Sequence, residues 1–415
     1  MLTSVLILLM LAIQLGPSYY ASVATVALIL VIVNWASPVA AGAIRSARFS
    51  WIVVLMPLQL LDLPSYDRSA DLLRIAREAV LFVVLVGAII GARHAAMAKL
   101  KPTPVTAIVA VIGFLFLLAV VQSIMLPRGI YIGVPEAYYT LETGTIASEA
   151  ALRWTADSLR PTGTFAEPSY LGFVLISLSL MLAPRLDTYR TTLPLLGLII
   201  LTGLLARSLA FVFALGLVIL LPIAFQRSRN RGLIIMGALL GIAAALVFTP
   251  AVSILGRLFL AASSTTADYS TNVRIFAPFQ TLPRYLLAHP FGAPVSVVDR
   301  VLIGFIPDTS IDVQEFRSNA FTYLFFVYGI VAALLIGLTV WCGRDLRSRL
   351  YLLICFFFNG AFFAIDKVAI IAMTIFIYEY GMRARALALP TPGTARTPVR
   401  PARPARVAAA ARSRP

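Results

Sequence analysis

The polar residues that could carry chemistry gather in four short stretches of an otherwise apolar chain. In chain order, the stretches read RPTGTFAEPSYLG, LTGLLARSLAFVFALGL, VRIFAPFQTLPRYLLAHPFG and RSNAFTYLFFVYGIVAALL. Each lies beside or between apolar runs, where a charged side chain is costly and is therefore a candidate for function. The charged and polar residues of interest in these stretches are Arg160, Glu167, Arg207, Arg274, Arg284, His289, Arg317 and Asn319.

Arginines at the ends of helices favour the recognition of phosphate groups. A planar guanidinium bonds two phosphate oxygens at once, and helix N-termini add further N–H donors. We therefore expect the five arginines to bind a diphosphate and to stabilise it as a leaving group in place of a metal. A carboxylate or an imidazole could take the proton of an attacking hydroxyl, so Glu167 and His289 are the candidate catalytic residues, with Asn319 on the acceptor side.

Several of these residues also have structural interpretations. Pro168 suits the first turn of a helix, and Glu167 before it would meet the positive end of the helix dipole. Gly163 permits a tight turn, and Asn319 is a favoured N-cap. Arg207 could extend its guanidinium to the membrane surface from a short turn between helices. These structural roles explain how the helices begin, but they do not explain why the remaining arginines are present.

The composition indicates an all-α polytopic membrane protein. Of the 415 residues, 60% are hydrophobic and 13% are charged, whereas a soluble domain is about half apolar and about a quarter charged. Apolar runs of roughly 15–23 residues recur, close to the length that a bilayer core requires of a helix. The two cysteines and two histidines show no metal-ligand spacing. Walker and GxGxxG motifs are absent, so we expect neither a metal nor another cofactor.

The basic residues determine the predicted topology. About twelve candidate spans are separated by loops, and lysine and arginine concentrate in alternate loops, which marks those loops as cytoplasmic. This pattern places both termini in the cytoplasm and two long loops on the opposite face. The predicted divisions are N-terminal transmembrane helices over 1–126, a long loop over 127–167, central transmembrane helices over 168–250, a larger loop over 251–318, C-terminal transmembrane helices over 319–381 and a disordered basic tail over 382–415.

Two other charged segments receive structural interpretations. Much of the net charge of +16 lies in the tail from Arg383 to Pro415, which is rich in proline, alanine and arginine. Such a tail fits disorder beside anionic membrane lipids better than binding to nucleic acid. The segment PSYDRSADLLRIARE, over 64–78, has apolar residues at helical spacing. We expect it to form an interfacial amphipathic helix with a structural role.

In their order and spacing, the four stretches resemble those of the O-antigen polymerase and ligase superfamily, and most of all Wzy-type exopolysaccharide polymerases. The similar part covers roughly 155–340. The resemblance implies a bacterial inner-membrane protein with a GT-C-like fold and two long periplasmic loops. It also implies a metal-independent, inverting glycosyltransferase that joins undecaprenyl-diphosphate-linked oligosaccharide repeat units into exopolysaccharide or O-antigen at the periplasmic face. A flippase and a chain-length co-polymerase are the candidate protein partners.

The resemblance also suggests which arginines bind the diphosphate, and it shows two departures. The family arginines match Arg160, Arg207 and Arg274, and then Arg284 and Arg317. Many relatives, ligases above all, have a histidine before the asparagine of the fourth stretch, where this chain has Ser318. Without that histidine, Glu167 or His289 must serve as base, or no base acts. The HPFGAP sequence also lacks the second glycine of the common HPxxGxG form.

Three functions remain open from the sequence. The missing histidine favours a polymerase over an O-antigen ligase or another lipid-linked glycosyltransferase of the superfamily. A polysaccharide transporter or flippase is the third alternative. Transporters favour broken helices near mid-membrane and internal repeats, whereas this chain shows no convincing repeat and keeps its charges near helix ends and in the long loops.

Overall fold

The described part of the chain is built from helices. The computed structural model describes residues 51–61, 68–94, 105–130, 132–133, 160–165, 168–185, 189–206, 208–220, 276–306, 319–358 and 362–388, with isolated positions at 26, 29, 40, 41, 44, 313 and 316. All regular secondary structure in these ranges is helical, which confirms the predicted all-α class. The spans predicted before residue 51, apart from the isolated positions, and near 232–250 lie outside the described ranges, as does the basic tail from residue 389 onward. The first residues of the predicted disordered tail, 382–388, are instead the helical end of α20 (Ile365–Ala388).

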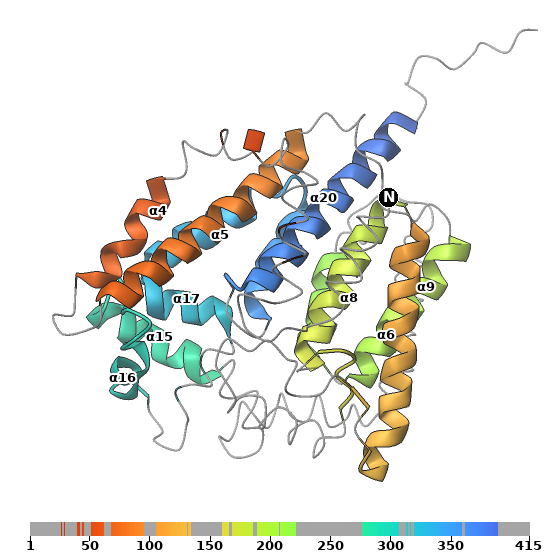
Figure 1. Cartoon of the computed structure of the whole chain (residues 1–415), viewed down its shortest axis with the longest axis horizontal. Helices are drawn as coiled ribbons and strands as arrows, with labels where there is room; N and C mark the ends of the chain where they lie inside the picture. The colour runs from red at the N-terminus through yellow and green to blue at the C-terminus, as the bar shows by residue number, and fades with distance from the viewer. Residues whose placement is uncertain are drawn as a thin grey trace, which may run out of the picture.

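Four helices lie side by side in one layer (Figure 1). They are α5 (Arg68–His94), α20 (Ile365–Ala388), α8 (Pro168–Leu182) and α6 (Val105–Met125). Helix α20 packs against α5 on one side and α8 on the other, and α6 packs against α8 and α9 (Tyr189–Leu205). Positions 367–379 of α20 are all buried. This buried and mostly apolar part of α20 is therefore the centre of the described core.

Shorter elements complete the bundle. Helix α15 packs against α17, and α17 continues through a break into α18, which packs against α19. The elements are α4 (Trp51–Leu55), η2 (Met56–Leu60), η4 (Leu126–Arg128), η6 (Ala183–Arg185), α10 (Leu209–Leu215), the π-helical η7 (Gly216–Leu220), α15 (Ala277–Ala288), α16 (Val298–Ile303), α17 (Ala320–Tyr328), α18 (Val331–Trp341), α19 (Leu346–Ile354) and η10 (Cys355–Phe357).

Local sequence signals predicted several helix boundaries correctly. Helix α8 begins at Pro168, where a missing N–H costs no hydrogen bond. Asn319 is the N-cap of α17, and its side-chain oxygen accepts hydrogen bonds from the N–H groups of Phe321 at 3.1 Å and Thr322 at 3.3 Å. Gly163 adopts a φ of 66° in a turn, as its predicted role required. These three predictions are confirmed.

Two predictions about single elements are wrong. The segment over 64–78 was expected to be a separate interfacial helix, but α5 runs without interruption from Arg68 to His94. Its apolar periodicity continues into the next apolar run, so no break separates them. The predicted span over 319–341 is divided instead, because Gly329 ends α17 with a φ of 54°. A continuous apolar run does not reveal such a break.

Contacts between distant segments define one end of the bundle, which we call the motif end. Gln122 near the end of α6 bonds the turn that contains Gly163, and Tyr170 at the start of α8 donates to Asp366 at the start of α20. At the same lower end of Figure 1, the start of α5 meets the segment before α16, where Ser296 donates to Asp71. The motif end therefore includes parts of the first, third and fourth stretches.

The opposite end of the bundle holds the basic segment over 343–349, which connects α18 to α19 and includes the first turn of α19; we call this segment the basic loop. Arg344 pairs with Glu379 of α20 at 3.4 Å, and Tyr378 donates to Asp345. Asp345 also closes a capping box with Ser348 at the start of α19. Glu379 lies 13 positions after Asp366, which is about 20 Å along a helix. This basic loop and the motif end are thus separated along α20.

Among the described helices, one is long and apolar enough to cross a membrane by length and composition. It is the segment Val105–Arg128, which comprises α6 and η4. Five shorter apolar helices have 10–17 residues, and these are Trp51–Leu60, Pro168–Leu182, Pro194–Leu205, Ala210–Ile219 and Val331–Trp341.

Candidate functional site

Gln122 holds the turn that carries Arg160. Its side chain is fully buried, and its oxygen accepts hydrogen bonds from the N–H groups of Thr162 at 3.0 Å and Gly163 at 2.8 Å. Its amide nitrogen donates to the carbonyl oxygens of Gly163 at 2.8 Å and Ile132 at 2.6 Å. One amide thereby uses two acceptor sites and two donors. The backbone beside Arg160 is fixed to α6, and the Arg160 side chain itself is half-buried.

The same turn leads into the start of α8 and brings a carboxylate to the first stretch. Phe165 packs against Tyr170 with ring centroids 5.3 Å apart. The Tyr170 hydroxyl donates to the carboxylate of Asp366, in the first turn of α20. The adjacent Lys367 is buried and donates to the carbonyl oxygen of Phe358 at 3.0 Å. The sequence interpretation missed Asp366, because it lies about 200 residues from the stretch that it meets.

The backbones of the third and fourth stretches contact each other at two glycines, Gly292 and Gly329. The N–H of Ile330 donates to the carbonyl oxygen of Pro290 at 2.9 Å, and the N–H of Ala293 donates to that of Phe326 at 2.9 Å. A Cβ on Gly329 would lie 2.1 Å from the Pro290 oxygen, and a Cβ on Gly292 would lie 2.3 Å from the Val327 oxygen. Neither site has room for a side chain. The HPFG turn therefore packs closely against the break after α17, and Gly292 is the one glycine that the turn contributes to this contact.

His289 has the surroundings of a packing residue. It follows α15, and its ring lies 5.3 Å from that of Tyr285 and 5.8 Å from that of Phe305, between centroids. Its Nδ1 atom is buried and has no hydrogen-bond partner among the described residues. Arg284, on the same helix, is exposed. The structure thus separates the roles of these two residues, with the imidazole partly buried and the guanidinium at the surface.

Four of the eight predicted site residues are described, and they lie in two places. Arg284 and His289 lie on or beside α15, which packs against the helix that Asn319 caps. Arg160 lies eight positions before the first residue of α8, also at the motif end. The other four predicted residues, Glu167, Arg207, Arg274 and Arg317, lie outside the described residues.

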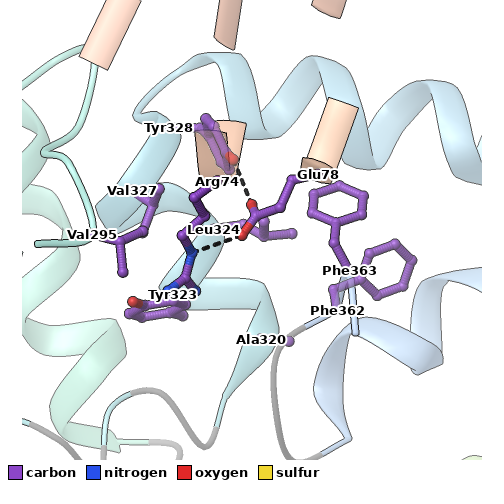
Figure 2. A pocket seen from close by; sticks show the side chains of 10 residues that line it. All are labelled: Arg74, Glu78, Val295, Ala320, Tyr323, Leu324, Val327, Tyr328, Phe362 and Phe363. Atoms are coloured by element: carbon purple, nitrogen blue, oxygen red, sulfur yellow. Dashed lines mark hydrogen bonds and ion pairs between the residues drawn. The ribbon is translucent and has the colours of Figure 1, made fainter. Parts of the chain in front are cut away.

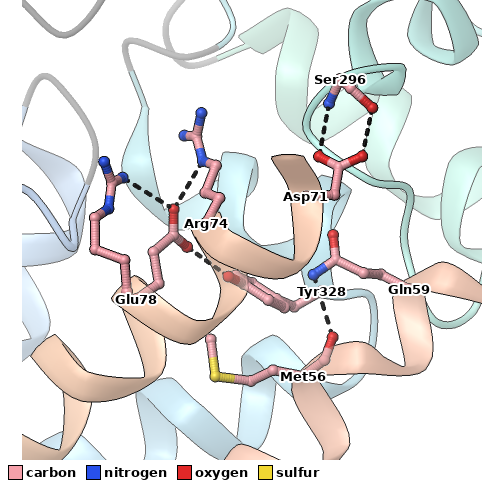
Figure 3. Close-up of polar contacts among 8 residues, drawn as sticks. Met56, Gln59, Asp71, Arg74, Glu78, Ser296 and Tyr328 are labelled. Atoms are coloured by element: carbon pink, nitrogen blue, oxygen red, sulfur yellow. Dashed lines mark hydrogen bonds and ion pairs between the residues drawn. The ribbon is translucent and has the colours of Figure 1, made fainter. Parts of the chain in front are cut away.

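A buried charged cluster on α5 was missed by the sequence interpretation (Figure 3). Arg74 Nε bonds Glu78 Oε1 at 3.0 Å, and Arg77 Nη2 lies 3.6 Å from the same oxygen. The Tyr328 hydroxyl of α17 donates to the other carboxylate oxygen of Glu78 at 2.5 Å. The Glu78 side chain is 7% exposed, so this carboxylate is almost removed from water. The four-residue spacing between Arg74 and Glu78 predicts an ion pair along one helix. The burial of Glu78, however, depends on Tyr328, which lies 250 positions away.

Two members of the charged cluster, Arg74 and Glu78, line a small pocket between α5 and α17 (Figure 2). Arg74 and Glu78 face Tyr323 and Tyr328 across it, and Phe362 and Phe363 form one apolar wall. Its interior of about 10 Å³ suits one water molecule or one oxygen atom. Val295 and Ala320 also contribute, so the pocket lies where the third and fourth stretches approach α5.

Comparison of this chain with protein-family models, with curated proteins and with solved structures found no match. The described residues include no group of three histidine, cysteine or acidic side chains that could hold a metal ion. The case for a function therefore depends on the arginine-bearing turn at the motif end, on the glycine contact between the third and fourth stretches, and on the charged pocket beside them.

Proposed function

We propose that this chain is a multi-pass bacterial inner-membrane glycosyltransferase that polymerises undecaprenyl-diphosphate-linked oligosaccharide repeat units at the periplasmic face. The observation that carries the proposal is the gathering of the first, third and fourth stretches at one end of the bundle. There, Gln122 fixes the turn beside Arg160, and the HPFG turn packs on the C-terminal end of α17, the helix that Asn319 caps at its N-terminus. Charged groups at helix ends next to apolar helices suit a lipid-linked anionic substrate.

The surface of α6 supports a membrane location. Its outward side chains Phe114, Leu117, Val121 and Ile124 are 50%, 63%, 39% and 50% exposed. Their spacing of three or four residues puts them on one face, opposite a buried apolar face. A helix that is apolar on both faces and exposed on one suits contact with lipid tails better than contact with water. The shorter apolar helices would span the membrane together with their flanking segments, in the predicted set of about twelve.

The separation of charges along α20 supports the proposed orientation. The basic loop over 343–349 lies at the end opposite the motif end. Basic loops remain in the cytoplasm, so the motif end would face the periplasm. In that compartment a transferase must use a donor that is already activated, and a lipid-linked diphosphate provides such a leaving group without a nucleotide.

The proposed reaction is a single displacement at the anomeric carbon. The oxygen of an acceptor hydroxyl forms a bond to that carbon while the bond to the diphosphate oxygen breaks, which inverts the centre. Undecaprenyl diphosphate leaves with the electron pair, and the hydroxyl proton passes to a base, for which Glu167 and His289 are the candidates. Arg160, Arg207 and Arg274 would stabilise the charge that develops on the leaving diphosphate, with Arg284 and Arg317 nearby.

The proposal is tested by the glycans that accumulate on the lipid carrier in cells. Deletion of the gene should leave single repeat units on the carrier, and Arg160→Ala should reproduce that state. Arg128→Ala is the matched control, since Arg128 is an exposed arginine at the end of α6, and it should leave chain lengths at the wild-type value. Wild-type chains in cells producing the Arg160→Ala protein would overturn the site, and long polymer retained on the carrier after deletion would indicate a ligase.

A transporter is the second candidate, because four acidic or basic side chains of the described residues are buried within helices. Asp71, Glu78, Lys367 and Glu379 are each at most 5% exposed. Buried ionisable groups in a membrane protein often mark a substrate or proton path. Purified protein that moves the lipid-linked unit across a vesicle membrane without forming new glycosidic bonds would favour this candidate over the polymerase.

A further inference from the structure

Phe211 is enclosed between two glycines of neighbouring helices. Its side chain lies in the first turn of α10 and is fully buried. A Cβ on Gly203 of α9 would lie 2.1 Å from two atoms of the Phe211 ring, and a Cβ on Gly172 of α8 would lie 2.9 Å from the Phe211 Cβ atom. In a close-packed interior, neither glycine has room for a side chain unless Phe211 moves. Both glycines are therefore required for Phe211 to lie where it does.

The contact of Phe211 with the two glycines brings the first and second stretches together. Gly172 is the last residue of RPTGTFAEPSYLG, whereas Gly203 and Phe211 belong to LTGLLARSLAFVFALGL. Gly172 follows the first residue of α8, Pro168, by four positions, which is about 6 Å along a helix. The start of α10 therefore lies close to the start of α8, at the motif end. Parts of all four stretches are thus found at this end of the bundle.

The connection between α9 and α10 is held by the same packing. The N–H of Ser208 donates to the carbonyl oxygen of Gly203 at 3.4 Å, and the Ser208 hydroxyl accepts from the N–H of Phe211 at 3.4 Å. Ala206 and Ser208 are 0% and 6% exposed. In the sequence, Arg207 stands between these two buried residues, although it lies outside the described residues itself. The structure therefore fixes both chain neighbours of Arg207.

We propose that Phe211 is a positioning residue of the transferase, and that Gly172 and Gly203 allow it to hold the α9–α10 connection against α8. Phe211 acts through Arg207, which the proposed function assigns to the diphosphate, so this inference rests on that function. A side chain whose backbone is already fixed loses less conformational freedom when it binds a ligand, and its affinity for the ligand is higher. The two glycines then serve substrate binding as well as packing.

The binding test uses the purified full-length protein in detergent, with farnesyl diphosphate as a short lipid diphosphate. Arg207→Gln should raise the dissociation constant by about tenfold, because one charge-assisted contact is lost. Gly172→Ala should raise it by about threefold to tenfold, because the added methyl group displaces the start of α10 from α8. Gly197→Ala and Gly216→Ala are the matched controls, since a Cβ at either position meets nothing within 4 Å. Their dissociation constants should stay within about twofold of the wild-type value.

The positioning role is tested by coupling between substitutions. When Arg207 is already Gln, Gly172→Ala should change the dissociation constant by less than about twofold, since the arginine that it displaces is absent. Phe211→Leu removes the ring that lies against Gly203 and should show the same coupling, so it decides the question if the Gly172→Ala protein does not fold. A merely structural role would lower the unfolding temperature and weaken binding equally in both backgrounds. Equal effects would therefore overturn the positioning role.

The outcomes also separate this inference from the proposed function. Wild-type affinity in the folded Gly172→Ala and Phe211→Leu proteins, unchanged binding by Arg207→Gln, or no binding by the wild type overturns the inference. If the coupling is found but the purified wild-type protein leaves lipid-linked repeat units single, the polymerase falls and the role of Phe211 in diphosphate binding stands. If the wild-type protein polymerises them and Phe211→Leu weakens binding equally with and without Arg207, the reverse holds.

Discussion

Gln122 determines where Arg160 can lie, because its amide makes four hydrogen bonds with backbone groups of two segments. Gln122→Leu would leave up to four backbone groups without partners, each costing about 1–3 kcal/mol if no water replaces the amide. We expect a lower unfolding temperature in detergent and shorter glycan chains in cells.

The control for that prediction is Ser123→Ala on the same helix. Ser123 only donates to the carbonyl oxygen of Ala119 within α6, at 2.8 Å. Its loss should change the free energy of unfolding by about 1 kcal/mol or less and leave chain lengths unchanged. A Gln122→Leu protein with wild-type stability and wild-type glycan would show that the amide does not hold the turn.

At the scale of single residues, the sequence predicted local roles and missed distant partners. Pro168, Gly163 and the Asn319 cap follow from rules that involve a few neighbouring residues, and all three are confirmed. Gln122 meets Thr162 and Gly163 about 40 positions away, and Glu78 meets Tyr328 across 250 positions. Such contacts depend on how helices pack, so residue types and spacing do not disclose them.

At the scale of elements, a close backbone contact connects the HPFG turn to the α17–α18 break, and we call this contact the joint. Gly329→Ala should destabilise it by about 2–4 kcal/mol, because a methyl group would both meet the Pro290 oxygen and occupy a φ of 54°. Thermal unfolding in detergent measures the loss. Gly337→Ala is the control, since its Cβ would meet nothing within 4 Å, and α18 should gain up to about 1 kcal/mol.

An equal unfolding temperature for the Gly329→Ala and Gly337→Ala proteins would contradict this account of the joint. The joint also shows a feature that sequence patterns did not predict at this scale. A continuous apolar run predicts one helix over 319–341, yet the carbonyl of Pro290 takes the N–H of Ile330 and the helix divides there. The tertiary contact accompanies the positive φ of Gly329, and this glycine, one of two in the apolar run, did not reveal the break from the sequence.

At the scale of the whole molecule, the separation of the motif end from the basic loop makes the orientation testable. Arg128→Cys should react with a membrane-impermeant maleimide added to spheroplasts, because Arg128 is exposed at the motif end. Leu346→Cys should react only after lysis, since Leu346 is 49% exposed in the basic loop at the other end. The native Cys342 and Cys355 are 3% and 0% exposed, so their background should be low.

Labelling of Leu346→Cys in intact spheroplasts, with protection of Arg128→Cys, would reverse the proposed orientation. At this scale, composition predicted the all-helical class, which the described residues confirm. The number of spans stays a prediction, since one helix among those described is long and apolar enough by itself. The lengths of short apolar helices connected by turns do not determine how many times the chain crosses a bilayer.

The most direct test of the central claim is a reaction with purified components. Lipid-linked repeat units extracted from cells that lack the gene are mixed with the full-length protein in detergent or vesicles. We expect glycan of several repeats and one free undecaprenyl diphosphate for each new glycosidic bond, with Arg160→Ala slower by about a hundredfold or more and Arg128→Ala unchanged. Lipid-linked units that remain single while the wild-type protein stays folded, or an Arg160→Ala protein that polymerises at the wild-type rate, would contradict the account.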